Sequence, residues 1–88
     1  MTNYYGYRNW LVKIDAPFFG TTKAFIFNLE SGEHHSFPVQ ARDTHGFICE
    51  YININYYDST DFSRGFGGLV PLSGRDSQMA QELFNRFF

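Results

Sequence analysis

The chain has 88 residues, a single cysteine and a formal charge of −2. A single cysteine excludes an internal disulfide framework, and the length favours a single domain that spans residues 1–88. The charge lacks the excess of basic residues that is typical of nucleic-acid binders. The sequence has no apolar run of about 18 residues, the length that a transmembrane helix requires. The first residues show no basic segment followed by an apolar one, so we expect no secretory signal, no membrane contact and a cytoplasmic location.

Aromatic residues make up 20% of the chain, with 11 Phe, 6 Tyr and 1 Trp. A buried aromatic side chain removes roughly 150 to 250 Å² from water, which helps a small core. The number is nevertheless larger than a core of this size encloses. We therefore expect part of the aromatic set to lie on the surface as a contact area.

Residues 1–8 (MTNYYGYR) mix aromatic and polar positions without a clear period, and we interpret them as a flexible N-terminal arm. Residues 9–15 alternate, with Trp10, Val12 and Ile14 on one side. This pattern predicts a strand with one buried face.

Residues 23–40 predict a β-hairpin that turns at Ser31-Gly32, where glycine supplies the positive φ of the turn. Pairing Glu30 with Glu33 places Leu29 opposite His34. Two apolar sets then lie on opposite faces: Ala24, Ile26, Phe37 and Val39 on one, and Phe25, Phe27 and Leu29 on the other. A strand that is apolar on both faces either lies at the centre of a sheet that is covered twice or exposes one side to a partner.

Residues 47–57 (FICEYININYY) form the longest strand that we predict. One face carries Ile48, Ile52, Ile54 and Tyr56, and we expect it in the core. The opposite face carries a stripe of mainly aromatic and amide side chains: Phe47, Cys49, Tyr51, Asn53, Asn55 and Tyr57.

Residues 58–68 are a loop by composition, and residues 69–72 form either a short edge strand or a connector. Residues 73–88 predict a helix that Ser73 or Asp76 caps. Its apolar stripe consists of Met79, Ala80, Leu83, Phe84 and Phe87. The predicted fold class is α+β: a small antiparallel β-sheet of three to four strands, built on the central hairpin 23–40 and the long strand 47–57, with one C-terminal helix packed against it.

The glycine-rich segment 64–76 (RGFGGLVPLSGRD) invites comparison with phosphate-binding loops. A Walker loop needs a lysine after its last glycine, and no lysine follows Lys23. A dinucleotide loop needs a third glycine and a helix where Pro71 stands. Residues 73–75 could hold an anion on free N–H groups, but Asp76 places a carboxylate there. We therefore interpret the segment as a turn followed by a helix cap, and expect no cofactor.

Asp43, His45 and Cys49 are all at odd-numbered positions, so on an extended strand they would share one face, which suggests a thiol nucleophile with a histidine base. On an extended strand, side chains four positions apart are separated by about 13 Å, too far for proton transfer. The adjacent His34 and His35 point to opposite faces of a strand and cannot share a metal ion. We therefore expect neither catalytic residues nor a metal site.

The aromatic and amide stripe suits a protein interface, because tyrosine offers stiff contact area and asparagine offers adaptable hydrogen bonds. The same residue types occur in base-stacking platforms for single-stranded nucleic acid, but the basic residues here are scattered among nine acids. Burial of the stripe under another element is the third alternative. The predicted partner-binding residues are Tyr5, Tyr7, Tyr51, Asn53, Asn55, Tyr57, Arg64 and Phe66.

We predict a small non-enzymatic protein-binding module that occupies the surface of another protein, for instance in a host nucleoprotein complex, or that pairs with its own copy as a homodimer. Phage-encoded inhibitors of host defence systems, anti-CRISPR proteins among them, are one class in which chains of this size and type are common. Two alternatives stay open: a single-stranded nucleic-acid-binding module with an aromatic platform, and a small cysteine-dependent enzyme.

Overall fold

The computed structural model describes residues 2–17, 19–40, 42–57 and 68–88. Their elements are β1 (Thr2–Tyr7), β2 (Trp10–Asp15), β3 (Thr22–Asn28), β4 (His34–Val39), α1 (Thr44–Tyr56), β5 (Val70–Pro71) and α2 (Gly74–Phe87). The strands form an antiparallel sheet in the order β4-β3-β2-β1-β5. The predicted α+β class is confirmed, with one strand and one helix more than we expected.

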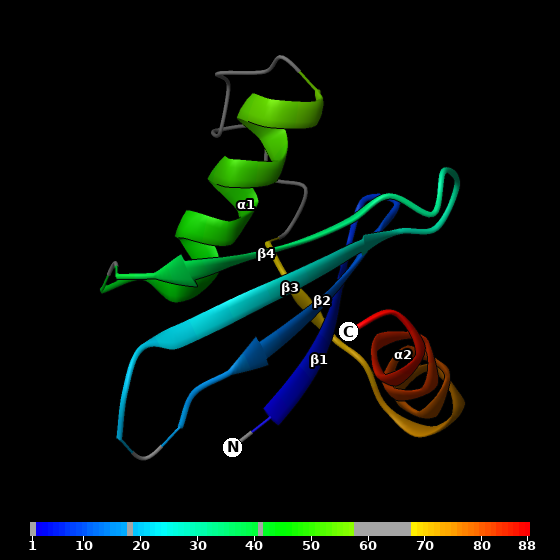
Figure 1. Ribbon diagram of the computed structural model, residues 1–88. Coiled ribbons are helices and arrows are strands. Elements are labelled where there is room, and N and C mark those ends of the chain that lie inside the picture. The colour runs from blue at the N-terminus through cyan, green and yellow to red at the C-terminus, as the bar shows by residue number, and fades with distance from the viewer. Residues whose placement is uncertain (1, 18, 41, 58–67) are drawn as a thin grey trace.

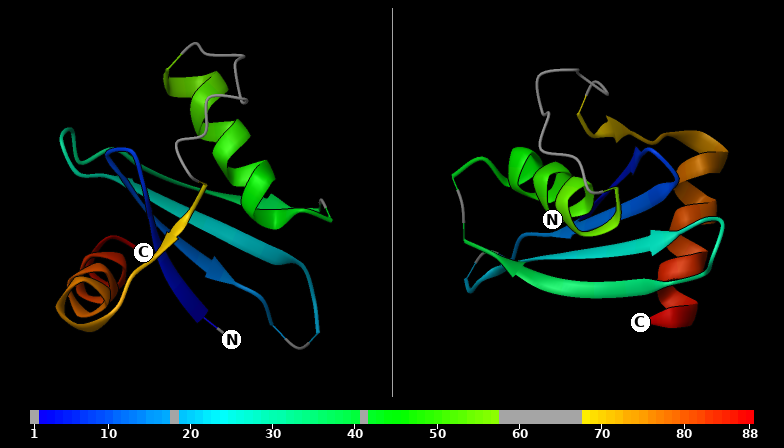
Figure 2. Two further views of the ribbon diagram at one scale, coloured as in Figure 1. Left: turned by 180° about the vertical axis from the view of Figure 1, so that it is seen from behind. Right: turned by 90° about the horizontal axis from the view of Figure 1, so that it is seen from above.

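The two helices cover opposite faces of the sheet (Figures 1 and 2). On the α1 face, Val12 of β2 and Ile26 of β3 pack with Ile48 and Ile52. On the α2 face, Leu11 and Phe27 pack with Ala80 and Phe84. Strand β3 is therefore apolar on both faces because both faces are covered, which decides between the two alternatives that the sequence leaves open. Strand β2, predicted to have one buried face, also buries Leu11 on the other.

The N-terminal segment is a strand and not a flexible arm. Strand β1 pairs with β2 along its whole length, from Thr2 opposite Asp15 to Tyr7 opposite Trp10, and with β5 on its other side. Its side chains alternate, so that Tyr4 packs on the α2 face while Tyr5 and Tyr7 pack on the α1 face. The prediction of a flexible arm is therefore wrong, because the tyrosines of this segment pack into the apolar clusters on both faces of the sheet.

The predicted long strand 47–57 is also wrong, since most of these residues belong to helix α1. The Asp43 carboxylate caps this helix by accepting a hydrogen bond from the Gly46 N–H (3.0 Å). A Cβ at position 46 would collide with that carboxylate, so glycine suits the site. Ile48 and Ile52, one helical turn apart, are fully buried against the sheet. Burial of this pair outweighs the strand preference of the isoleucines and tyrosines.

The hairpin is confirmed, but its register differs by two residues from the predicted one. His34 lies opposite Phe27, and the strand ends at Asn28. The Asn28 side chain accepts hydrogen bonds from the N–H groups of Glu30 and Ser31, and Gly32 has a φ of 76°. This asparagine closes a longer turn than the two-residue turn that we predicted. The faces are unchanged, because a shift of two residues preserves the alternation.

The C-terminal helix and the short edge strand are confirmed as α2 and β5. Ser73 occupies the N-cap of α2, but its side chain makes no capping hydrogen bond. Ala80 and Phe84 of the predicted apolar stripe are fully buried, whereas Met79 and Phe87 stay largely exposed. Within the residues that the structure describes, no helix has the length and apolarity needed to cross a membrane.

Candidate protein-binding surface

Two of the predicted partner-binding residues belong to the core of the described structure. Asn53 is only 3% exposed, and Tyr7 of β1 is 5% exposed. The Tyr7 hydroxyl donates a hydrogen bond of 2.9 Å to Asn53 Oδ1, which ties β1 to α1. This pair holds the helix on the sheet and is not available as a contact surface.

Two more predicted residues, Tyr5 of β1 and Tyr57 at the C-cap of α1, make contacts within the molecule. The ring of Tyr5 packs edge-on against His45, with centroids 4.9 Å apart. The Arg8 guanidinium lies 4.0 Å from the ring centroid of Tyr57, within the range of a cation–π contact. Both tyrosines are partly buried and already engaged within the molecule.

Arg64 and Phe66 complete the predicted set, and both lie outside the described residues. The residues that follow them support the turn interpretation of the glycine-rich segment, since Gly68 and Gly74 have φ values of 69° and 57°. Asp76 lies in the first turn of α2, where its carboxylate opposes the binding of an anion.

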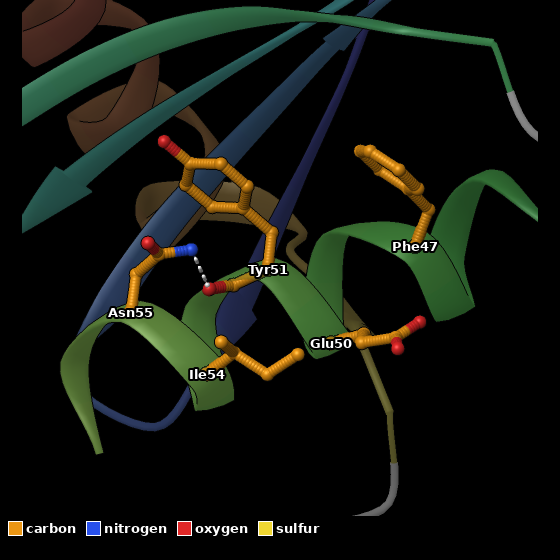
Figure 3. Close-up of a pocket in the computed structure, with 5 residues that line it drawn as sticks. All are labelled: Phe47, Glu50, Tyr51, Ile54 and Asn55. Carbon is orange, nitrogen blue, oxygen red and sulfur yellow. Dashed lines mark hydrogen bonds between the residues drawn. The ribbon is translucent and has the colours of Figure 1, made fainter. Parts of the chain in front are cut away.

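Tyr51 and Asn55, the remaining predicted residues, lie together on the side of α1 next to β4. With Phe47, Glu50 and Ile54 they line a shallow hollow of about 260 Å³. We call these five residues the α1 flank. Figure 3 shows Phe47 and Tyr51 pointing from the helix toward the sheet, while Ile54 and the Glu50 carboxylate point away from it. The hollow is thus open, with aromatic walls and a single ionisable carboxylate.

The aromatic wall of the hollow is supported from the edge strand β4. Phe37 stacks on Tyr51 with ring centroids 4.0 Å apart and an angle of 20° between the rings. The ring centroid of Phe37 also lies 6.2 Å from that of Phe47. The Asn55 side-chain amide donates to the Tyr51 carbonyl at 2.8 Å. Phe37 thus supports the Tyr51 ring from the side of β4, while the bond to the Tyr51 main-chain carbonyl fixes the Asn55 amide.

A neighbouring tyrosine stays neutral at physiological pH. Burial, with smaller contributions from Tyr51 and Glu33, raises the pKa of Tyr56 from 10.0 to about 12. Its ring lies 4.5 Å from the buried Trp10 ring and 6.4 Å from Tyr51. His35, whose Nε2 lies 3.1 Å from the Glu33 carboxylate, stacks on the Tyr56 ring, so the neighbourhood of the hollow holds ionisable groups besides Glu50.

Sequence reasoning missed Ile54 as a surface candidate, because the strand interpretation placed it on the core face; Glu50 was the one polar exception on that face. A helical period would have grouped the flank correctly. Positions 47, 50, 51, 54 and 55 are separated by three or four residues and share one side of a helix. The spacing of these residues therefore indicated a helix, but the strand-forming composition of the segment led us to predict a strand.

The helix also changes the geometry of His45 and Cys49, which now lie one turn apart. Burial and, to a smaller degree, the Asp43 carboxylate raise the pKa of the Cys49 thiol. This direction opposes the thiolate that a nucleophile needs. Among the described residues no cluster of His, Cys, Asp or Glu could hold a metal ion.

The geometry of the α1 flank is the main guide to function. The chain matches no family model, no curated protein and no solved structure.

Proposed function

We propose that this chain is a non-enzymatic protein-binding module that receives an apolar side chain of a partner protein in the hollow of the α1 flank. The observation that carries the proposal is the exposure of Ile54, which is 50% accessible beside a hollow with Phe47 and Tyr51 in its walls. Aromatic side chains are enriched in protein interfaces, and the exposed Ile54 adds apolar area beside them.

The charge of the hollow favours a protein over a nucleic acid. Its five lining residues include one carboxylate, Glu50, and no basic group. A phosphate backbone would meet a negative charge there, whereas a partner lysine or arginine would be attracted. Two of the tyrosines that could have stacked on bases, Tyr5 and Tyr7, pack within the protein.

The partner that we expect presents an apolar side chain with a cationic group close to it. The apolar side chain would fill the hollow between Tyr51 and Ile54, and the cation would lie near Glu50. Inhibition of a host defence system by a phage-encoded protein, as in anti-CRISPR proteins, stays a prediction from size and composition. The identity of the captured partner tests that wider role.

The test is affinity capture from the source cells with three forms of the protein, followed by identification of the bound protein. The variant Ile54→Asp places a charge in the hollow. The matched control Met79→Asp places the same charge on α2, at a methionine that is 46% exposed. We expect the natural chain and the control to recover the same partner, and Ile54→Asp to lose it at an unchanged melting temperature. Equal recovery by both variants, or no partner for the natural chain, would contradict the proposal.

A further inference from the structure

We propose that the free edge of β4 pairs with β4 of a second copy of this chain, so that two five-stranded sheets join into one continuous sheet. The inference goes beyond the proposed function, because it concerns the backbone edge of the sheet and not the hollow of the α1 flank. β4 lies at the end of the strand order, and no described strand lies on its outer side.

The register of the hairpin shows which backbone groups of β4 point outward. In an antiparallel pair, opposite residues alternate between hydrogen-bonded and non-hydrogen-bonded pairs. The Asn28 N–H donates to the Glu33 carbonyl at 2.8 Å, so this is a hydrogen-bonded pair. His34, Ser36 and Pro38 therefore stand in the non-hydrogen-bonded positions, with their backbone groups directed away from β3.

Pro38 agrees with this assignment, because a proline has no N–H and is tolerated where the strand faces away from its neighbour. Residues 34 and 36 thus offer two outward N–H donors, and residues 34, 36 and 38 offer three outward carbonyl acceptors. Within residues 2–17, 19–40, 42–57 and 68–88, no described backbone hydrogen bond satisfies them. The edge is an unfilled template for another strand.

A second β4 fits this template in an antiparallel register centred on Ser36. The N–H of Ser36 then donates to the Ser36 carbonyl of the other copy, and the N–H of His34 donates to the Pro38 carbonyl. By two-fold symmetry each bond occurs twice, which gives four backbone hydrogen bonds. Because both strands carry proline at position 38, the missing donor falls at the two ends of the paired segment and leaves its centre intact.

The side chains of β4 are compatible with the same register. His35 lies opposite Phe37 of the second copy on the α1 face, and such aromatic cross-strand pairs stabilise a sheet. Charged residues and proline are common blocks on an exposed edge. β4 has no Lys, Arg, Asp or Glu, and its one proline, Pro38, falls at the end of the paired segment. The opposite edge strand β5 is only two residues long, so it offers too few backbone groups to pair in this way.

The pairing has a consequence for the α1 flank. A two-fold axis perpendicular to the sheet leaves both α1 helices on the same face. The two flanks then lie on this shared face, each on the β4 side of its helix and therefore toward the axis. The dimer therefore presents both hollows on one face, and a partner with two matching groups would gain affinity through its second contact.

The test measures the mass of the full chain in solution by light scattering and native mass spectrometry. We expect twice the 10.3 kDa of one chain. Ser36→Lys and Ser36→Glu each place two like charges opposite one another at the axis, so each variant alone should be monomeric. A mixture of the two should form a heterodimer, which also shows that both variants are folded. The controls Asn85→Lys and Asn85→Glu carry the same charges on the exposed side of α2 and should stay dimeric.

Three results would overturn this inference: a natural chain that is monomeric up to high micromolar concentration, Ser36 variants that each remain dimeric, or Ser36 variants that fail to combine when mixed. The proposed function can fail separately. A monomer that still captures its partner through Ile54 overturns the strand pairing alone. A dimer that captures no partner overturns the proposed function alone.

Discussion

The hydrogen bond between Tyr7 and Asn53 allows a quantitative test of how α1 is held on the sheet. It joins residues that are 46 positions apart in the chain, and both side chains are buried. We propose a double-mutant cycle with Tyr7→Phe, Asn53→Ala and the double variant. Tyr7→Phe removes the donor and leaves the buried Asn53 carbonyl oxygen without it, while Asn53→Ala removes the acceptor.

The expected magnitudes follow from the burial of the pair. Removal of one partner from a buried hydrogen bond costs about 1 to 3 kcal/mol, because the other group stays desolvated. The double variant should cost less than the sum of the two single variants, with a coupling of about 1 kcal/mol. In a domain of this size, each kcal/mol corresponds to a fall in melting temperature of about 4 to 8 °C.

The free energy of unfolding can be measured by urea titration, with the fluorescence of the single tryptophan, Trp10, as the signal. This side chain is 1% exposed, so its emission should shift strongly on unfolding. Asn55→Ala is the matched control, since Asn55 is an exposed asparagine on the same helix, and it should change stability by less than about 0.5 kcal/mol. A coupling below about 0.3 kcal/mol, or an equal cost at Asn55, would refute the assignment of Asn53 to the core.

Three further predictions follow from buried groups. Phe84→Ala should lower the free energy of unfolding, measured by chemical denaturation, by about 3 to 5 kcal/mol, because the fully buried Phe84 ring packs between α2 and the sheet. Phe87→Ala should lower it far less, because Phe87 is 43% exposed, and similar losses for the two variants would contradict this packing. Asp43→Asn should lower the pKa of Cys49 and accelerate its alkylation at pH 8, since a negative charge that disfavours the thiolate is removed, and an unchanged rate would exclude this interaction. Because the pKa of Tyr56 is raised, the unfolded chain releases this proton at a lower pH than the folded chain does, so the contribution of Tyr56 to the free energy of unfolding should be complete below pH 10 and be lost as the pH rises toward about 12. Tyr56→Phe should flatten this part of the plot of stability against pH, and an unchanged slope would argue against the raised pKa.

Several elements could be predicted from local sequence alone. Strand β2 follows from the alternation around Trp10, and α2 follows from an apolar stripe at helical spacing that ends in the buried Phe84. The two apolar faces of β3 and β4 were also correct, because alternation depends only on the backbone period. The exposure of the predicted contact residues could not be inferred from local sequence. Tyr51 and Asn55 line the hollow of the α1 flank, where Asn55 is exposed and Tyr51 is partly buried, whereas Asn53 and Tyr7 are buried.

The sequence by itself thus determined the elements whose period is clear, and the tertiary structure decided the rest. Residues 47–57 have a strand-like composition, and only the sheet beneath Ile48 and Ile52 makes their helical form more favourable. Residues 2–7 are a strand because β2 pairs with all of them and β5 pairs with Tyr5 and Gly6, which no local pattern could show. The hollow of the α1 flank depends on both decisions, since it exists only when a helix carries Ile54 outward and β4 brings Phe37 beneath Tyr51. Long-range burial, which acts between residues distant in the chain, therefore created the surface on which we base the function.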